Sequence, residues 1–152
     1  MKTNRLMFSL KLLIGFLLLG LAAYAASDEE TSLFDLKGRA TAYIAEDMTI
    51  YLWDGKPVAY LDGDKPKDGL NIYGFNGKHL GWYKGGILYD HDGKVVGGIK
   101  AAFKTPTESE PFKGFKQFKP FKSFKKFAPF KPFFSKEWAE LPLKFFLKRG
   151  AD

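Results

Sequence analysis

The sequence of 152 residues contains no cysteine and only two histidines. Without cysteine there are no disulfides, no thiolate nucleophiles and no zinc site of the usual cysteine type. Residues 33–103 also lack serine, so that stretch offers no serine nucleophile for an acyl-transfer triad. His79 and His91 alone make a poor metal site, and we expect them to be structural or exposed. These absences favour a protein that is not an enzyme and predict neither a cofactor nor a metal.

One long apolar run lies near the N-terminus, from Leu12 to Leu21, and three basic residues precede or flank it. The small-x-small pattern of Ala23-Tyr24-Ala25 follows the run. Together these features predict a signal peptide over residues 1–25 and an acidic linker over residues 26–32. We therefore expect an exported protein, periplasmic or extracellular. An uncleaved segment that anchors the chain in the membrane is the alternative.

A twelve-residue phrase occurs four times, at residues 33–44, 50–61, 72–83 and 88–99. The first position is aliphatic, the second aromatic, the seventh basic and the tenth small in every copy. The sixth position is always glycine: Gly38, Gly55, Gly77 and Gly93. A repeat of this length is too short for helical or propeller repeats and suits one β-hairpin per copy.

The Asp-Gly or Asn-Gly pairs of three copies, and the weaker Lys37-Gly38, predict two-residue type I′ turns, which need φ > 0 at both residues. Such turns make the second position face the ninth across the hairpin. The first, tenth and twelfth positions then share the opposite face. The predicted cross-strand pairs are Phe34–Thr41, Tyr51–Val58, Tyr73–Leu80 and Tyr89–Val96. Because one hairpin is marginal in water, we expect all four to share a core.

Beyond a linker at residues 105–111, phenylalanine occurs at every third residue from Phe112 to Phe133, and lysine follows most of them. Prolines at 120, 129 and 132 exclude a continuous α-helix over residues 112–134. The period of three suits an extended, polyproline-II-like tail or a disordered one. Residues 135–152 contain a candidate short helix interrupted near Pro142. Residues 112–152 carry a net charge of +8, and residues 27–111 carry −4.

The Y-x-x-[DN]-G-K phrase in four copies, with the basic Phe-rich tail, resembles the bacterial 4-fold beta flower domain family. The resemblance covers about Leu33 to Phe103. It implies an all-β domain of four β-hairpin repeats with pseudo-fourfold symmetry, over residues 33–104, to which the extended tail is attached. It implies no established activity and assigns no functional residue.

The tail supplies the main candidate binding site. Its charge favours docking on its own acidic domain, with phenylalanine edges in grooves between hairpins and ammonium groups left outward for an anionic partner. An external anionic envelope polymer or membrane surface is the competing partner, whereas nucleic acid is not expected in an exported compartment. The candidate anion-binding residues are Lys113, Lys116, Lys119, Lys122, Lys125, Lys126 and Lys131.

Two further sites are weaker. Trp53, Trp82 and Tyr83 form a candidate platform for stacking glycans, although we expect such rings to be core and cross-strand partners. Asp35 and Asp90 share the third repeat position, which makes them a candidate carboxylate pair for a hydrolase. The sequence thus favours an exported, non-enzymatic envelope or interaction module, with a glycan or cell-wall binding module as the alternative.

Overall fold

The computed structural model describes residues 29–151, so the predicted signal peptide lies outside the described residues. Within these residues eight strands are followed by one short helix, and two 3-10 turns, Pro66–Asp68 and Lys100–Ala102, lie between them. The strands and the helix are β1 (Thr31–Phe34), β2 (Ala40–Ile44), β3 (Thr49–Leu52), β4 (Pro57–Asp62), β5 (Leu70–Gly74), β6 (His79–Lys84), β7 (Ile87–Tyr89), β8 (Val95–Gly98) and α2 (Leu143–Lys148).

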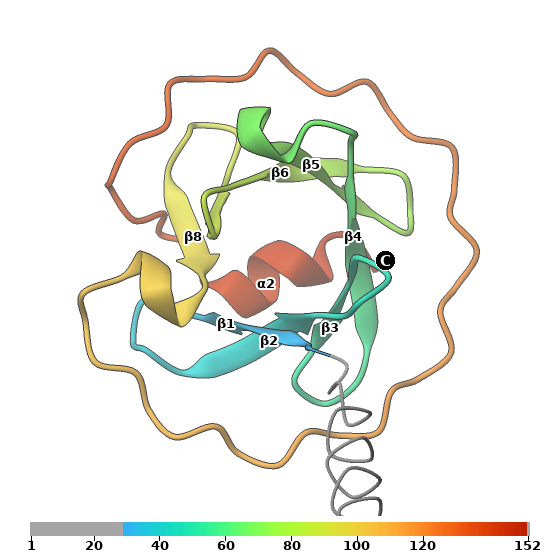
Figure 1. Ribbon diagram of the computed structural model, residues 1–152. Coiled ribbons are helices and arrows are strands. Elements are labelled where there is room, and N and C mark those ends of the chain that lie inside the picture. The colour runs from blue at the N-terminus through green and yellow to red at the C-terminus, as the bar shows by residue number, and fades with distance from the viewer. Residues whose placement is uncertain (1–28, 152) are drawn as a thin grey trace, which may run out of the picture.

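The strands form a closed barrel in chain order, each antiparallel to the next (Figure 1). β1 closes the ring by pairing with β8 through Phe34 and Gly98. Each repeat supplies one hairpin: β1–β2, β3–β4, β5–β6 and β7–β8. The predicted all-β fold of four hairpin repeats with pseudo-fourfold symmetry is confirmed. Every strand within residues 29–151 therefore has a neighbour on both sides, which limits pairing with another chain.

The hairpin tips are three-residue loops, and the predicted type I′ turns are wrong. In the second repeat the N–H of Gly55 donates to the carbonyl of Leu52 at 2.9 Å, and the N–H of Leu52 donates to the carbonyl of Lys56 at 2.8 Å. The four tip glycines have φ between 74° and 93°, but Met48 is the only non-glycine residue with positive φ among residues 29–151. A type I turn followed by a glycine bulge fits these facts, and type I′ does not.

A side-chain oxygen completes each tip. Asp54 accepts the N–H of Lys56 at 3.0 Å. In the first and fourth repeats the acceptor is the carboxylate at the third position, Asp35 or Asp90. Asp35 also binds the guanidinium of Arg39 through two hydrogen bonds of 2.9 and 2.7 Å. These two carboxylates therefore stabilise turns, which is the ordinary use of such residues in loops.

The cross-strand register differs from the prediction by one residue. Tyr51 pairs with Pro57 and Ile50 with Ala59, so Val58 is the extra residue of a bulge. The same shift occurs in the other three hairpins, and the four predicted pairs of the second with the ninth position are wrong. The physical reason is that the glycine adds a residue to the tip, which moves the partner of Tyr51 by one residue. The separate bulge at Val58 places that extra side chain in the inner apolar cluster, together with Ala59.

Helix α2 fills the barrel (Figure 1). Leu143, Phe146 and Leu147 are at most 1% exposed and belong to the same apolar cluster as the inner strand residues. The small tenth position makes room for the helix, because a Cβ on Gly97 would lie 2.6 Å from a methyl carbon of Leu143. The barrel core is thus completed by a segment more than forty residues away along the chain.

Between β8 and α2 the chain runs once around the outside of the barrel (Figure 1, orange to red). We call residues 108–135 the belt. The belt contains neither helix nor strand. Its position must therefore be fixed by contacts with the barrel.

Candidate functional site

The belt is attached to the four hairpin tips at intervals of nine residues. Its backbone N–H groups donate to the carbonyl oxygens of the four tip glycines at 2.8–2.9 Å. The donor–acceptor pairs are Glu108–Gly38, Gln117–Gly55, Lys126–Gly77 and Ser135–Gly93. Each quarter of the barrel therefore takes nine belt residues, which are three Phe triplets.

Glycine is required where the belt crosses a tip. A Cβ on Gly55, Gly77 or Gly93 would collide with a belt carbonyl oxygen, and one on Gly38 would collide with a carbonyl oxygen just before the belt. The colliding oxygens belong to Pro106, Phe115, Phe124 and Phe133, again nine residues apart. The tip glycines, expected from the sequence to serve the turns, thus also admit the belt.

The sequence contained a signal for this register that the period of three obscures. The tripeptide Pro-Phe-Lys begins at Pro111, Pro120 and Pro129, nine residues apart. Each of these prolines stands three residues after one crossing point and six before the next, where no N–H group donates to the barrel. A proline costs no hydrogen bond there and keeps the chain extended.

The belt lysines turn toward the barrel, and the expectation that their ammonium groups point outward is wrong. Three barrel carboxylates form ion pairs with four of these lysines, and two further contacts involve Lys122 and Lys131. The ion pairs are Lys113–Glu30 (2.7 Å), Lys116–Glu30, Lys119–Asp47 and Lys125–Asp62 (2.9 Å). Lys122 lies 4.0 Å above the centroid of the Tyr60 ring, and Lys131 donates to the carbonyl of Asp68 at 2.7 Å.

The remaining candidate lysine, Lys126, contacts the barrel through its backbone. Besides its N–H bond to Gly77, its carbonyl accepts the hydroxyl of Tyr73 at 2.9 Å. Tyr73 also receives the ammonium of Lys125 over its ring at 5.6 Å. Outer-face aromatic rings of the barrel are therefore the surface on which the belt rests.

Belt residues nine positions apart make equivalent contacts with the aromatic ring at the second position of successive repeats. Lys116 and Lys125 lie over Tyr51 and Tyr73, which hold the second position of their repeats. In the next quarter Phe134 replaces lysine and stacks on Tyr89, with ring centroids 4.1 Å apart and planes 8° from parallel. Two cation–π contacts and one ring-stacking contact thus occupy equivalent places in three quarters.

Partial burial by itself would raise the pKa of the Asp47 carboxyl, but hydrogen bonds from Lys119 and Thr49 outweigh it and hold that pKa at about 2. In the same way, burial is outweighed at Glu30 by hydrogen bonds from Lys113 and Lys116, and the pKa of Glu30 is lowered. Both carboxylates are consequently charged, and hold the belt, throughout the ordinary pH range.

The phenylalanine rings point away from the barrel. Their exposed fractions are between 98% and 103%, so the expectation that they fill grooves between hairpins is wrong. The exposed set is Phe112, Phe115, Phe118, Phe121, Phe124, Phe127, Phe130 and Phe133. Lysine contacts occupy the side of the belt that faces the barrel, and the outer side is apolar.

The three candidate glycan-stacking rings do not share one surface. Trp82 is only 1% exposed, and Phe134 lies 6.1 Å from it. Tyr83 packs against the barrel core. Trp53 is partly exposed, and its indole N–H donates to the carbonyl of Pro111 at 3.1 Å. Of the three, Trp53 lines an open cavity.

The two histidines meet beside Trp82. The Nδ1 of His79 lies 3.0 Å from Nε2 of His91, and Nε2 of His79 lies 3.1 Å from the Oδ1 of Asn71. Burial, and then the neighbouring His91, lower the pKa of His79 to about 4. His79 is therefore neutral in the folded protein at pH values where an exposed histidine is already protonated.

We expect the free energy of unfolding to decrease as pH falls from about 6.5 to about 4. In that window the unfolded chain binds a proton at His79 that the folded chain does not bind, so acid favours unfolding. Urea unfolding at pH values of about 7 and about 5 measures the effect. His79→Gln should lose less stability between the two values than the parent does; an equal loss would contradict the assignment to His79.

Over residues 29–151 no group of three His, Asp or Glu side chains is placed to hold a metal ion. Within the same residues, no helix is long and apolar enough to cross a membrane.

A family model described as "4-fold beta flower protein" matches residues 31–147, a stretch that includes the barrel, the belt and most of α2. No curated protein and no solved structure matches the chain.

Proposed function

This chain belongs to the 4-fold beta flower protein family, and we propose that it is an exported, non-enzymatic interaction module whose belt inserts phenylalanine rings into a lipid surface. The observation that carries the proposal is the complete exposure of the eight outward rings. Export rests on the leader-like pattern of residues 1–25, and the non-enzymatic character rests on the lack of serine and cysteine in residues 33–103.

Exposure of eight phenylalanine rings to water is energetically unfavourable unless a partner covers them. Full burial of one phenylalanine is worth about 1.5–3 kcal/mol, and extended apolar surface on a protein usually marks an interaction site. Successive rings are three residues apart and do not form one continuous patch. Separate anchors of this kind suit a fluid interface, where each ring inserts independently, as on interfacial amphipathic segments.

The geometry limits how many rings act together. The belt surrounds the barrel, and one quarter contains nine residues and three outward rings. A flat surface therefore meets about one quarter of the belt at a time, and any side of the barrel can face it. About three inserted rings give reversible binding, weaker than a spanning segment.

The inward lysines predict the type of lipid dependence. Because Lys113, Lys119 and Lys125 are paired with barrel carboxylates, few ammonium groups remain for lipid phosphates. Binding should thus persist on zwitterionic membranes and change little with salt. A cationic arm would instead require anionic lipid and lose binding as salt screens the charges.

Vesicle flotation of the mature chain, residues 26–152, tests the proposal. We expect flotation with phosphatidylcholine vesicles, with and without phosphatidylglycerol. Replacing all eight outward phenylalanines by serine should abolish it, whereas the matched replacement by leucine should retain it. Neither change should shift thermal unfolding, because the rings touch nothing. Unchanged flotation of the serine variant, or flotation that needs anionic lipid and low salt, would refute insertion of the rings.

A further inference from the structure

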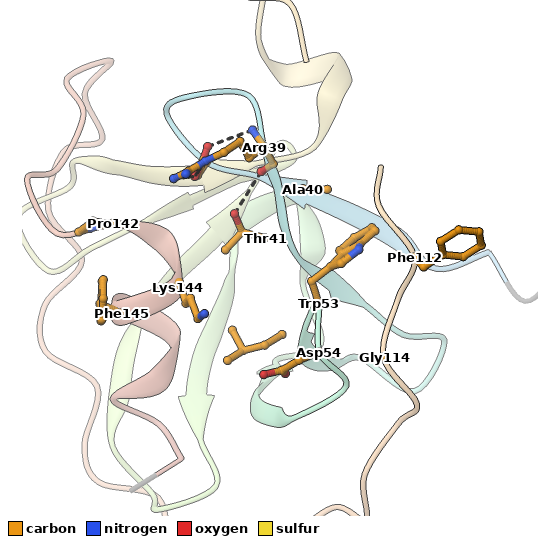
Figure 2. A pocket seen from close by; sticks show the side chains of 12 residues that line it. Arg39, Ala40, Thr41, Trp53, Asp54, Phe112, Gly114, Pro142, Lys144 and Phe145 are labelled. Atoms are coloured by element: carbon orange, nitrogen blue, oxygen red, sulfur yellow. Dashed lines mark hydrogen bonds and ion pairs between the residues drawn. The ribbon is translucent and has the colours of Figure 1, made fainter. Parts of the chain in front are cut away.

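An open cavity of about 700 Å³ lies between the tips of the first two hairpins, the first turn of α2 and the belt (Figure 2). Its size is within the range of small-molecule sites. The first tip contributes Asp35 and Arg39, the second contributes Trp53 and Asp54, and α2 contributes Lys144. Because α2 is not repeated within residues 29–151, the wall that carries Lys144 is specific to this quarter of the barrel.

The aromatic wall of this cavity is held in place before any ligand arrives. The indole N–H of Trp53 is bonded to Pro111 at 3.1 Å, and the ammonium of Lys113 lies 5.0 Å from the ring centroid. The ring of Tyr43 meets Trp53 edge-on, with planes 90° apart. A fixed indole loses little conformational freedom when a flat, weakly polar ligand stacks on it.

Polar groups line other parts of the cavity. Asp35 fixes the guanidinium of Arg39 through Nε and one terminal nitrogen, which leaves donors on the other terminal nitrogen. One oxygen of Asp54 accepts the N–H of Lys56, and the second remains an acceptor. Lys144 extends toward the cavity from α2 (Figure 2), and no ion pair within residues 29–151 involves it.

The charges of these groups cancel. Two carboxylates and two cations line the cavity, so it attracts neither anions nor cations strongly. A ligand with many hydroxyl groups can use both the donors and the acceptors, while its apolar ring face covers the indole. We propose that the cavity binds a neutral pyranose saccharide, with Trp53 as the stacking residue and Arg39, Asp54 and Lys144 as hydrogen-bonding residues.

The site differs from the platform expected from sequence, since Trp82 and Tyr83 take no part in it. It is also independent of the outward phenylalanine rings, apart from the edge of the cavity that Phe112 forms. A saccharide site and a lipid-binding belt on one envelope protein can therefore be tested separately.

Titration of the ¹⁵N-labelled mature chain with the trisaccharide of N-acetylglucosamine tests the inference. The chain has three tryptophans, so three indole N–H signals are expected, and Trp53→Phe assigns one of them. We expect a saturable shift of the Trp53 signal, with the Trp82 and Trp138 signals unchanged. Lys144→Ala should weaken the affinity about tenfold, as loss of a hydrogen bond to a charged group does.

Lys136→Ala is the matched control, because Lys136 is an exposed lysine outside the cavity. It should bind as the parent does. The inference is overturned if the Trp53 signal does not move, or if Lys144→Ala binds as tightly as Lys136→Ala. It is also overturned if trigalacturonate, an acidic trisaccharide, is the sole ligand that shifts the signal, because the cavity is then an anion site.

Discussion

Replacing Gly77 by alanine should lower the free energy of unfolding by more than about 2 kcal/mol and loosen the belt. Gly77 has a φ of 83°, which costs an alanine about 1–2 kcal/mol in strain. Its Cβ would also collide with the carbonyl oxygen of Phe124. The belt must then move away, and the bond between the N–H of Lys126 and the Gly77 carbonyl is lost.

Gly85→Ala separates the two effects. Gly85 has a positive φ of 58°, but a Cβ there meets nothing within 4 Å. The control should therefore show the backbone strain alone, about 1 kcal/mol. Denaturant unfolding gives the stabilities, and hydrogen exchange at the Lys126 amide reports on the belt. Equal stability losses, with protected Lys126 amides in both variants, would mean that the belt does not rest on the tips.

The second large effect concerns the helix inside the barrel. Phe146→Ala should destabilise the protein by about 3–5 kcal/mol, because Phe146 is 1% exposed and the vacated space is walled by strands on all sides. Phe145→Ala, one residue away, removes a ring that is 56% exposed. It should cost less than about 1 kcal/mol.

Thermal and urea unfolding measure the stabilities of the Phe146→Ala and Phe145→Ala variants. Similar stabilities would show that α2 is not part of the core. Truncation after Pro111 would remove most of the belt and also α2. The shortened protein should therefore fail to fold, and it cannot be used to examine the belt alone.

Several features of the barrel could be predicted because they depend on local chemistry. The Asp-Gly and Asn-Gly pairs locate the tips, and the regular spacing of the phrase gives four hairpins. The register could not be predicted, because the same dipeptide fits a type I′ turn and also a type I turn with a glycine bulge. The choice shifts Tyr51 from Val58 to Pro57.

The orientation of the belt could not be predicted from residue types. Burial of phenylalanine is favourable in general, and that argument led us to expect the rings against the barrel. The burial of phenylalanine has to compete with the barrel groups that face the belt. These groups are the carboxylates of Glu30, Asp47 and Asp62 and the ring face of Tyr60. Ion pairs and cation–π contacts with partners far away in sequence take the inner side for lysine. The meeting of His79 with His91 is likewise a product of strand pairing, which brings β6 beside β7.

The belt has two periods, one of three residues in its phenylalanines and one of nine residues in its contacts with the tips. Its length is therefore matched to the circumference of the barrel. An insertion or deletion that is not a multiple of three would rotate phenylalanine inward and lysine outward. A change of three or six residues would keep the rings outward but would bring a proline to a place where a backbone N–H is needed. The belt can therefore become longer or shorter without loss of contacts only by nine residues at a time, and each such change must be matched by the gain or loss of one hairpin. Barrel size and belt length should therefore change together, in units of one hairpin and nine belt residues.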